Sequence, residues 1–354
     1  MTLWRPVAAT GVGSMPGTSA LESTRIVAGE LADLIHVVEL PARGPGADMI
    51  GRTAAMLAEV DTAFGVETTP AGWRISGSRG RQMRRASSFL GEDLDALQQT
   101  AAAYGGPVKC QVVGPWTLAA AIELRTGERA LRDEGAVDDL AHALAAAAAA
   151  HVAEVRARIP GASSVLVQWD EPALASVLQG RIGTASGLSS YAPVDPQVAG
   201  RLLGVVLAAV ADAGGVAGVH CCADDPPLEV VRQAGASFVS VDITRIPADG
   251  PTERELGRLI EDGRGLIAGT VPSTGSVAAS GPGRMSDASV SAPLRDLLHR
   301  LGLEDGRYLE HLAVSPTCGL AGATPDWVRA ALESCAAVGR VLRQDEQGGA
   351  SDEA

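Results

Sequence analysis

The amino-acid sequence predicts an α/β protein built as a single (β/α)8 barrel. Short apolar runs alternate with longer helical segments along most of the 354 residues. The runs are continuously apolar, which is typical of parallel strands buried on both faces. Polar residues that could carry chemistry follow several runs directly, and barrel enzymes hold their active sites at the ends of their strands.

Eight runs have the length and composition of buried strands. They are Ala8–Gly13, Ile35–Leu40, Val108–Val113, Val165–Trp169, Val216–His220, Phe238–Asp242, Gly265–Val271 and His311–Ser315. Helices are expected at Gly51–Phe64, Leu90–Tyr104, Val137–Ile159, Asp195–Ala213, Pro227–Ala234, Glu253–Glu261, Ser291–Leu301 and Pro325–Leu342. Helical crossovers between parallel strands close such a set into one barrel.

Composition narrows the class of protein. One barrel domain is expected over residues 1–343, and the polar, acidic segment 344–354 is expected to be disordered. The sequence shows no signal peptide and no apolar stretch of about 18 residues, so we expect a cytoplasmic protein without a membrane segment. The net charge of −13 disfavours nucleic acid as a partner. Five cysteines, an odd number, indicate reduced thiols.

A cluster of metal-ligand residue types follows the fifth and eighth strands. Residues two apart on a strand share a face, so His220 and Cys222 project together while Cys221 faces away. Cys318 follows the eighth strand, and the loops of a barrel converge over its mouth. One imidazole and two thiolates are ligands that Zn²⁺ prefers.

Other readings of these residues remain open. On its own, His220 would more often be a core histidine than a metal ligand. The presence of Cys222 and Cys318 reverses this preference. A β-bulge could exchange Cys221 with Cys222. Cys110 and Cys335 have no such companions and are expected to be buried small hydrophobic residues.

Six short motifs occur in one order along residues 7 to 320. They are Gly13-Ser14-Met15-Pro16, Gly114-Pro115-Trp116-Thr117, Gln168-Trp169-Asp170-Glu171-Pro172-Ala173, His220-Cys221-Cys222, Val241-Asp242-Ile243-Thr244-Arg245 and Ser315-Pro316-Thr317-Cys318-Gly319-Leu320. Together they resemble the C-terminal catalytic half of cobalamin-independent methionine synthase, especially the short, single-barrel members of that family.

The resemblance implies zinc-dependent methyl transfer to the thiol of homocysteine, which gives methionine. It implies a zinc ion held by His220, Cys222, Asp242 and Cys318, where a coordinated thiol is deprotonated and becomes the nucleophile. Asp242 stands where the family has Glu, so its oxygen is displaced by about one C–C bond. We hypothesise that this carboxylate makes room for the incoming thiolate.

The resemblance also implies how the amino-acid end of homocysteine is bound. Asp170 and Glu39 would bind its ammonium group, and Ser14 would offer donors to its carboxylate. Glu171, next to Asp170, is a further candidate for substrate binding. The alternative for Asp170 and Glu171 is a solvated strand end or a helix N-cap.

The methyl donor is where the sequence departs from the family. The family's general-acid histidine after the seventh strand appears here as Pro272, so the catalytic proton donor is unknown. Methylfolate needs its amine leaving group protonated, and the N-terminal barrel of the folate-using enzyme is missing. Both departures favour a methylcorrinoid such as methylcobalamin over 5-methyltetrahydrofolate.

A basic segment lies between the second and third strands. It contains Arg74, Arg79, Arg81, Arg84 and Arg85. We hypothesise that these arginines dock an acidic corrinoid protein or a polyglutamate tail, and the alternative is a solubilising surface loop.

Three other functions fit parts of the pattern. A uroporphyrinogen decarboxylase-like enzyme would share the barrel without the metal set. A methyltransferase to another small thiol would not need an ammonium-binding acid. A non-catalytic protein would hold a structural zinc or use Cys221 and Cys222 as a redox pair.

Overall fold

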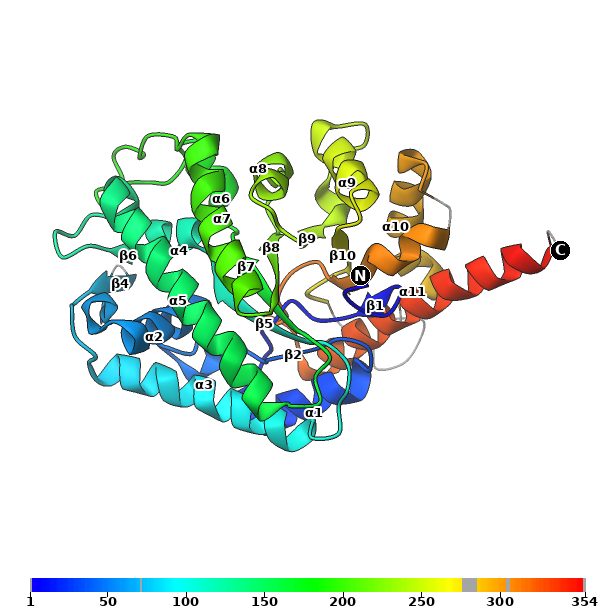
Figure 1. The fold of residues 1–354 in the computed structure, drawn as a ribbon, viewed down its shortest axis with the longest axis horizontal. Helices are drawn as coiled ribbons and strands as arrows, with labels where there is room; N and C mark the ends of the chain where they lie inside the picture. Colours follow the sequence, from blue (N-terminus) through cyan, green and yellow to red (C-terminus); the bar gives the residue numbers. More distant parts are fainter. Residues whose placement is uncertain (1, 71, 276–284, 304–305, 353–354) are drawn as a thin grey trace.

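The computed structural model describes residues 2–70, 72–275, 285–303 and 306–352. Eight strands form one curled sheet in the order β1-β11-β10-β9-β8-β7-β5-β2, with every pair parallel (Figure 1). Their bounds are β1 Ala8–Ala9, β2 Ile35–His36, β5 Val108–Val113, β7 Val165–Asp170, β8 Val216–Cys221, β9 Phe238–Asp242, β10 Gly265–Val271 and β11 Leu312–Pro316. All eight predicted strands are confirmed.

The first two strands are shorter than predicted, and the segments after them join the two ends of the sheet. Ser14 and Glu39 form a parallel bridge. The Met15 N–H donates to the Glu39 carbonyl over 2.8 Å, and the Glu39 N–H donates to the Gly13 carbonyl over 3.1 Å. These bonds connect the β1 and β2 sides, as a (β/α)8 barrel requires.

Helices surround the sheet (Figure 1). They are α1 Ala20–Glu30, α2 Met49–Val60, α3 Arg81–Thr100, α4 Pro115–Ala121, α5 Glu134–Arg158, α6 Leu174–Leu178, α7 Pro196–Asp212, α8 Leu228–Gln233, α9 Pro251–Glu261, α10 Asp287–Leu301 and α11 Pro325–Asp352. No helix among the described residues is long and apolar enough to cross a membrane.

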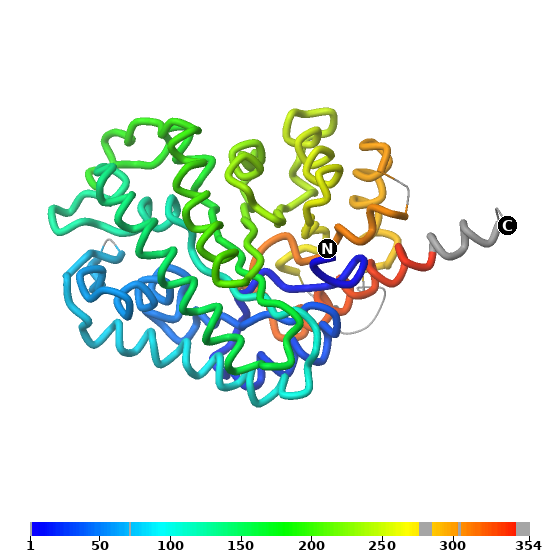
Figure 2. Tube along the Cα trace, in the orientation of Figure 1, coloured from blue at the N-terminus to red at the C-terminus, as the bar shows by residue number. Residues whose placement is uncertain are grey.

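Several helices differ from the sequence predictions: α1, α4 and α6 were not predicted, α3 begins at Arg81 rather than Leu90, and α11 continues further than predicted. α1 was missed because its buried residues are Ser23, Thr24 and Val27, which leave only a weak apolar pattern; Ser19 caps it by accepting from the Glu22 N–H. α11 continues to Asp352, so a helix occupies residues 344–352, where we expected disorder, and residues 353–354 lie outside the described part. Figure 2 shows the N-terminal segment beside α11, where Arg343 donates to the Pro6 carbonyl over 2.7 Å.

A small second sheet was not predicted. It contains β3 (Val66–Thr69), β4 (Gly72–Ile75) and β6 (Ile122–Glu123), in that order. Arg74 of β4 forms an ion pair with Glu123 of β6 over 2.7 Å. The strands of this sheet are too short and too polar on one side to stand out as apolar runs.

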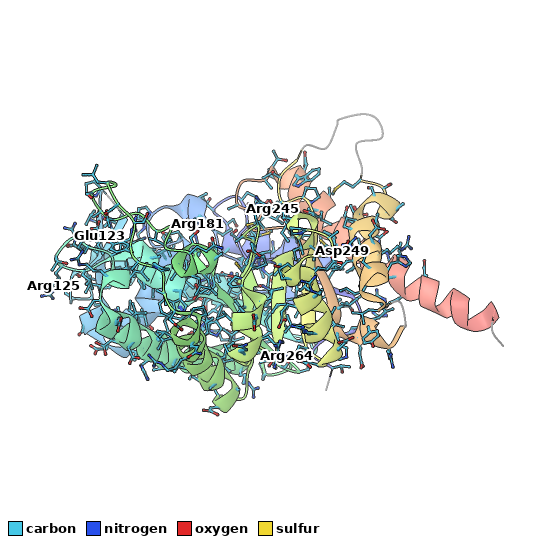
Figure 3. All side chains as sticks on the ribbon, turned by 90° about the horizontal axis from the view of Figure 1, so that it is seen from above. Glu123, Arg125, Arg181, Arg245, Asp249 and Arg264 are labelled. Carbon is cyan, nitrogen blue, oxygen red and sulfur yellow. The ribbon has the colours of Figure 1, made fainter. Side chains whose placement is uncertain are left out.

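The two ends of the barrel point to opposite sides of the molecule. Arg245 follows the C-terminal end of β9, and Arg264 precedes the start of β10; Figure 3 shows them on opposite sides. The strands are parallel, so their C-terminal ends share one face, and that face holds the site described next.

Candidate active site

A cavity of about 200 Å³ lies at the C-terminal ends of the barrel strands. It is lined by Val12, Gly13, Ser14, Glu39, Met49, Gln111, Asp170, Pro172, His220, Cys222, Cys318 and Gly319. Six of the eight site residues predicted from the sequence therefore line one cavity. Glu171 and Asp242 do not line it.

Three side chains at this cavity form a cluster suited to a metal ion. The ligand atoms of His220, Cys222 and Cys318 all lie within 4.8 Å of one another. The two sulfur atoms are 3.6 Å apart. Two thiolates bound to one tetrahedral zinc at about 2.3 Å would be about 3.8 Å apart, so the pair already has nearly the required spacing. Cys221 is buried and outside the cluster, as strand parity predicted.

The imidazole of His220 is held in a metal-binding orientation. His220 is 3% exposed, and its Nδ1 lies 3.0 Å from the Ser240 hydroxyl. Its Nε2 has no hydrogen-bond partner. With the proton on Nδ1 donated to Ser240, Nε2 presents a lone pair to a metal. Ser240 was missed by the sequence analysis; the signal was its place two residues before Asp242, on the strand that pairs with His220.

The two thiols of the cluster differ in acidity. The neighbouring Cys222 thiol and the nearby His220 imidazole lower the pKa of the Cys318 thiol to about 4. The pKa of Cys222 is raised, because its thiol is hydrogen-bonded to Cys318 and partly buried. Coupling between the two sulfur atoms therefore favours one thiol and one thiolate in the pair.

Asp242 does not join the three metal-ligand side chains. Its Oδ1 accepts from the Thr244 N–H over 3.0 Å and from the Thr244 hydroxyl over 2.6 Å. The residue ends β9 and caps the short helix that follows. The geometry therefore brings together three of the four zinc ligands implied by the resemblance.

Two buried carboxylic acids lie at the same cavity. Burial raises the pKa of Glu39 to about 8, opposed by the charge of Arg52. Burial also raises the pKa of Asp170, opposed by His220, by the hydrogen bond from Gln168 and by Lys109. A cationic group placed between these acids would relieve the cost of their burial.

Glu171, which was predicted to bind substrate, contacts a neighbouring helix instead of the cavity. Its side chain is fully buried, and its Oε1 accepts from the Trp116 N–H over 2.9 Å. Its Oε2 accepts from the Thr117 N–H over 2.8 Å and the Thr117 hydroxyl over 2.7 Å. The carboxylate thus caps the N-terminus of α4, and burial raises its pKa to about 7. A Cβ at Gly114 would overlap this carboxylate, which explains the glycine in that motif.

Two glycines let the loops of the cavity approach closely. Gly13 has a φ of +154°, and a Cβ there would lie 2.5 Å from Cδ of Gln111. A Cβ at Gly319 would overlap the hydroxyl of Ser14. Glycine at both positions therefore keeps Ser14 beside the Cys318 turn.

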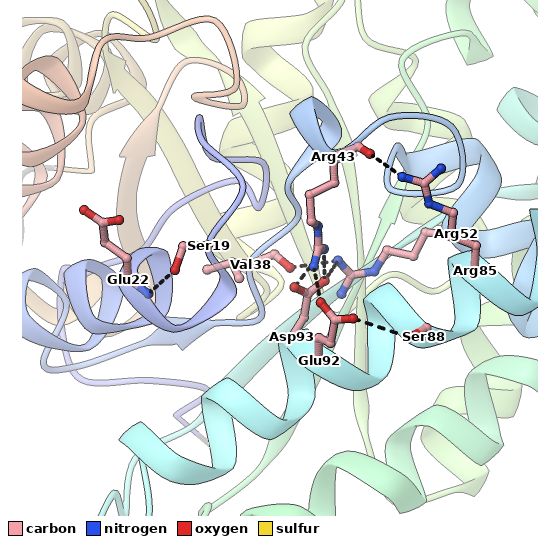
Figure 4. Close-up of polar contacts among 9 residues, drawn as sticks. All are labelled: Ser19, Glu22, Val38, Arg43, Arg52, Arg85, Ser88, Glu92 and Asp93. Atoms are coloured by element: carbon pink, nitrogen blue, oxygen red, sulfur yellow. Dashed lines mark hydrogen bonds and ion pairs between the residues drawn. The ribbon is translucent and has the colours of Figure 1, made fainter.

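A buried ionic network supports the segment that precedes Glu39. Asp93 of α3 binds Arg43 over 2.7 Å and Arg52 of α2 over 3.1 Å (Figure 4). Arg52 also donates to the Val38 carbonyl over 2.7 Å. The network ties α2 and α3 to the end of the second barrel strand, and no local sequence signal marks it.

Comparisons with known proteins identify the family to which this barrel belongs. Residues 7–340 match a family described as cobalamin-independent synthase, catalytic domain. No curated protein sequence matches the chain. Among solved structures, a B12-independent methionine synthase from Shewanella sp. W3-18-1, in complex with selenomethionine, aligns with a TM-score of 0.58 and 14% identity over 97% of this chain and 100% of its own.

Other barrels are more distant. A GH5_18 protein from Streptomyces cattleya aligns with a TM-score of 0.47 and 14% identity, over 95% of this chain and 80% of its own. At 14% identity the Shewanella structure shows the fold alone, and the family match covers nearly the whole barrel. The chain belongs to the cobalamin-independent synthase family, carries its catalytic domain, and is a methyltransferase of the methionine synthase type.

Proposed function

We propose that this protein transfers a methyl group to the thiol of homocysteine, using a zinc ion held by His220, Cys222 and Cys318. One observation carries the proposal: three ligand atoms lie within 4.8 Å of one another in a cavity that also contains two buried acids. Such a cavity suits an amino acid that ends in a thiol, because a thiophilic metal would bind the sulfur and the acids would bind the ammonium group.

The protein residues present fit zinc by their chemistry and spacing. When bound, zinc would supply the positive charge that keeps a coordinated substrate thiol deprotonated. Catalytic zinc sites have three protein ligands and one exchangeable position, which matches the cluster. We propose that Asp242 occupies the fourth position only when its carboxylate leaves Thr244, and that the substrate sulfur takes that position during catalysis.

The remaining cavity residues would orient the amino-acid end of homocysteine. Asp170 and Glu39 would bind the ammonium group, which would favour their ionised forms. The hydroxyl of Ser14 would donate to the substrate carboxylate. Glu171 would act on the site only through α4, because its carboxylate already accepts three hydrogen bonds.

The methyl donor expected from the sequence does not agree with the family. A methylcorrinoid is at odds with a family described as cobalamin-independent. Pro272 still provides no acid, and its carbonyl accepts from the Trp327 indole N–H over 3.1 Å. We therefore propose 5-methyltetrahydrofolate as the first donor to test, with its proton supplied from elsewhere than residue 272.

Four of the five arginines proposed for docking a donor have partners within the protein. Arg74 pairs with Glu123, Arg79 pairs with Glu59 over 2.6 Å, and Arg85 donates to the Arg43 carbonyl over 3.2 Å. Arg84 donates to the Arg79 carbonyl. These contacts support a structural role for most of the basic segment, and a corrinoid protein has no support as a partner.

A paired assay tests the proposed function. Purified protein should contain about one zinc per chain and should form methionine from homocysteine when supplied with 5-methyltetrahydrofolate, with methylcobalamin as the second arm. Cys318→Ala should lose both zinc and activity, because it removes one of three ligands. Cys335→Ala, at a buried cysteine outside the site, should retain both.

The same experiment separates the alternatives. A Cys318→Ala variant that remains fully active would exclude the proposed site. Zinc that can be removed only by unfolding the protein would indicate a structural ion. A redox pair of Cys221 and Cys222 has no support, because the sulfur near Cys222 is that of Cys318.

A further inference from the structure

Lys109 is the only lysine in the sequence, and it is completely buried. It lies on β5, opposite His36 of β2 and Leu166 of β7 in the barrel sheet. The other permanently charged basic residues of the protein are all arginines. Burying an ammonium group is costly, so its place beneath the cavity requires a compensating interaction.

The ammonium group of Lys109 determines the orientation of Gln168. Its Nζ donates to the Val12 carbonyl over 2.8 Å and to Oε1 of Gln168 over 2.9 Å. A lysine ammonium has only donors, so the amide atom facing it must be the oxygen. The Nε2 of Gln168 therefore faces the other way, and donates to Val12 over 3.0 Å and to Oδ1 of Asp170 over 2.7 Å.

This chain of contacts ends at the substrate cavity. Val12 and Asp170 both line it, whereas Lys109 and Gln168 lie behind them. Without Lys109, the buried Oε1 of Gln168 would lose its donor, so the Gln168 side chain would be free to shift and move the Asp170 carboxylate that its Nε2 holds. The electrostatics agree with this arrangement: the charge of Lys109 lowers the pKa of Asp170, and the charge of Asp170 raises that of Lys109 against the effect of burial.

We propose that Lys109 is a positioning residue that, through Gln168, aims the Asp170 carboxylate into the cavity and so selects thiols that carry an ammonium group. This inference rests on the proposed function. Lys109 makes no contact with the cavity itself, so its effect is on recognition of the amino-acid end and not on the metal cluster.

Two substrates and three variants test the proposal. The probes are homocysteine and 4-mercaptobutyrate, which is homocysteine without its amino group. Lys109→Met should raise the KM for homocysteine about 10-fold to 100-fold, the cost of losing a hydrogen bond to a charged group. The KM for 4-mercaptobutyrate and the zinc content should stay near wild type. Gln168→Met should give the same pattern, and the double variant should be no worse than either single variant.

The control is Cys110→Ala on the same strand. Cys110 is fully buried, and its sulfur contacts the Leu166 carbonyl over 3.6 Å, so it makes no hydrogen bond to Lys109, Gln168 or Asp170. This variant should lose stability without losing the preference for homocysteine. A merely structural role for Lys109 would give Lys109→Met the same result as Cys110→Ala.

The single lysine also allows a direct measurement. Protein labelled with ¹³C at the lysine ε-carbon should give one lysine signal, which should shift on adding homocysteine and remain in place on adding 4-mercaptobutyrate. An unchanged preference in both Lys109→Met and Gln168→Met, with an unshifted signal, would overturn the inference while the wild-type activity stands. A wild-type protein that does not methylate homocysteine would overturn the proposed function first.

Discussion

Glu171→Gln tests whether the carboxylate next to Asp170 holds α4 or binds substrate. The change keeps the size of the side chain and replaces one oxygen with an NH2 group. Oε1 accepts from the Trp116 N–H, and Oε2 accepts from Thr117. Either orientation of the amide therefore places its NH2 against a backbone N–H, and one buried donor is left unsatisfied.

The expected loss of stability follows from this one unsatisfied donor. One unsatisfied buried donor costs about 1–3 kcal/mol. An unfolding entropy of about 2.1 cal/mol/K per residue gives about 0.7 kcal/mol/K for 354 residues. The melting temperature should therefore fall by about 1–4 °C. Glu154→Gln, at a carboxylate whose side chain is 44% exposed, should change the free energy of unfolding by less than about 0.5 kcal/mol.

Calorimetry and steady-state kinetics together decide the role of Glu171. Glu171→Gln should melt earlier and keep a homocysteine KM close to that of the wild type, whereas Asp170→Asn should raise that KM. A Glu171→Gln variant that has the melting temperature of the wild type and raises the homocysteine KM as much as Asp170→Asn does would show that Glu171 binds substrate and does not stabilise α4.

Three further predictions follow from individual contacts. Ser240→Ala removes the partner of His220 Nδ1 and should lower zinc affinity about 10-fold to 100-fold in a chelator competition; equal affinity would contradict the role of Ser240. Gly319→Ala should raise the homocysteine KM because its Cβ would overlap the Ser14 hydroxyl, whereas Gly322→Ala, whose Cβ would meet nothing nearer than 3.8 Å, should not. Burial lowers the pKa of His151 to about 3, so only the unfolded state gains a proton as the pH falls below 6.5; at pH 5 this costs about 2 kcal/mol. In urea unfolding, His151→Gln should therefore lose less stability than the wild type between pH 7 and pH 5, and an equal loss in both would exclude this source of acid sensitivity.

Strand parity explains which of the predicted site residues reach the cavity. His220 and Cys222 share a face, and the structure brings both to the cavity with Cys318. Asp170 and Glu171 are adjacent, so they project to opposite sides. Asp170 therefore lines the cavity, and Glu171 reaches α4.

The sequence by itself determined the barrel and the face on which most of the candidate site residues lie. A strand buried on both faces is mostly apolar, so eight strands could be recognised without any tertiary contact. The parallel arrangement then placed the residues that follow these strands on one face of the molecule. α1 was missed because its buried face is mostly polar.

Only the tertiary structure decided which polar groups touch. Ser240 meets His220 across two strands, Lys109 reaches Asp170 through Gln168, and Asp242 turns to Thr244 rather than to the sulfur atoms. These choices depend on distances and donor directions between segments far apart in the chain. Periodicity reports the face on which a side chain lies, and a hydrogen bond or a metal ligand requires its position to within a few tenths of an ångström.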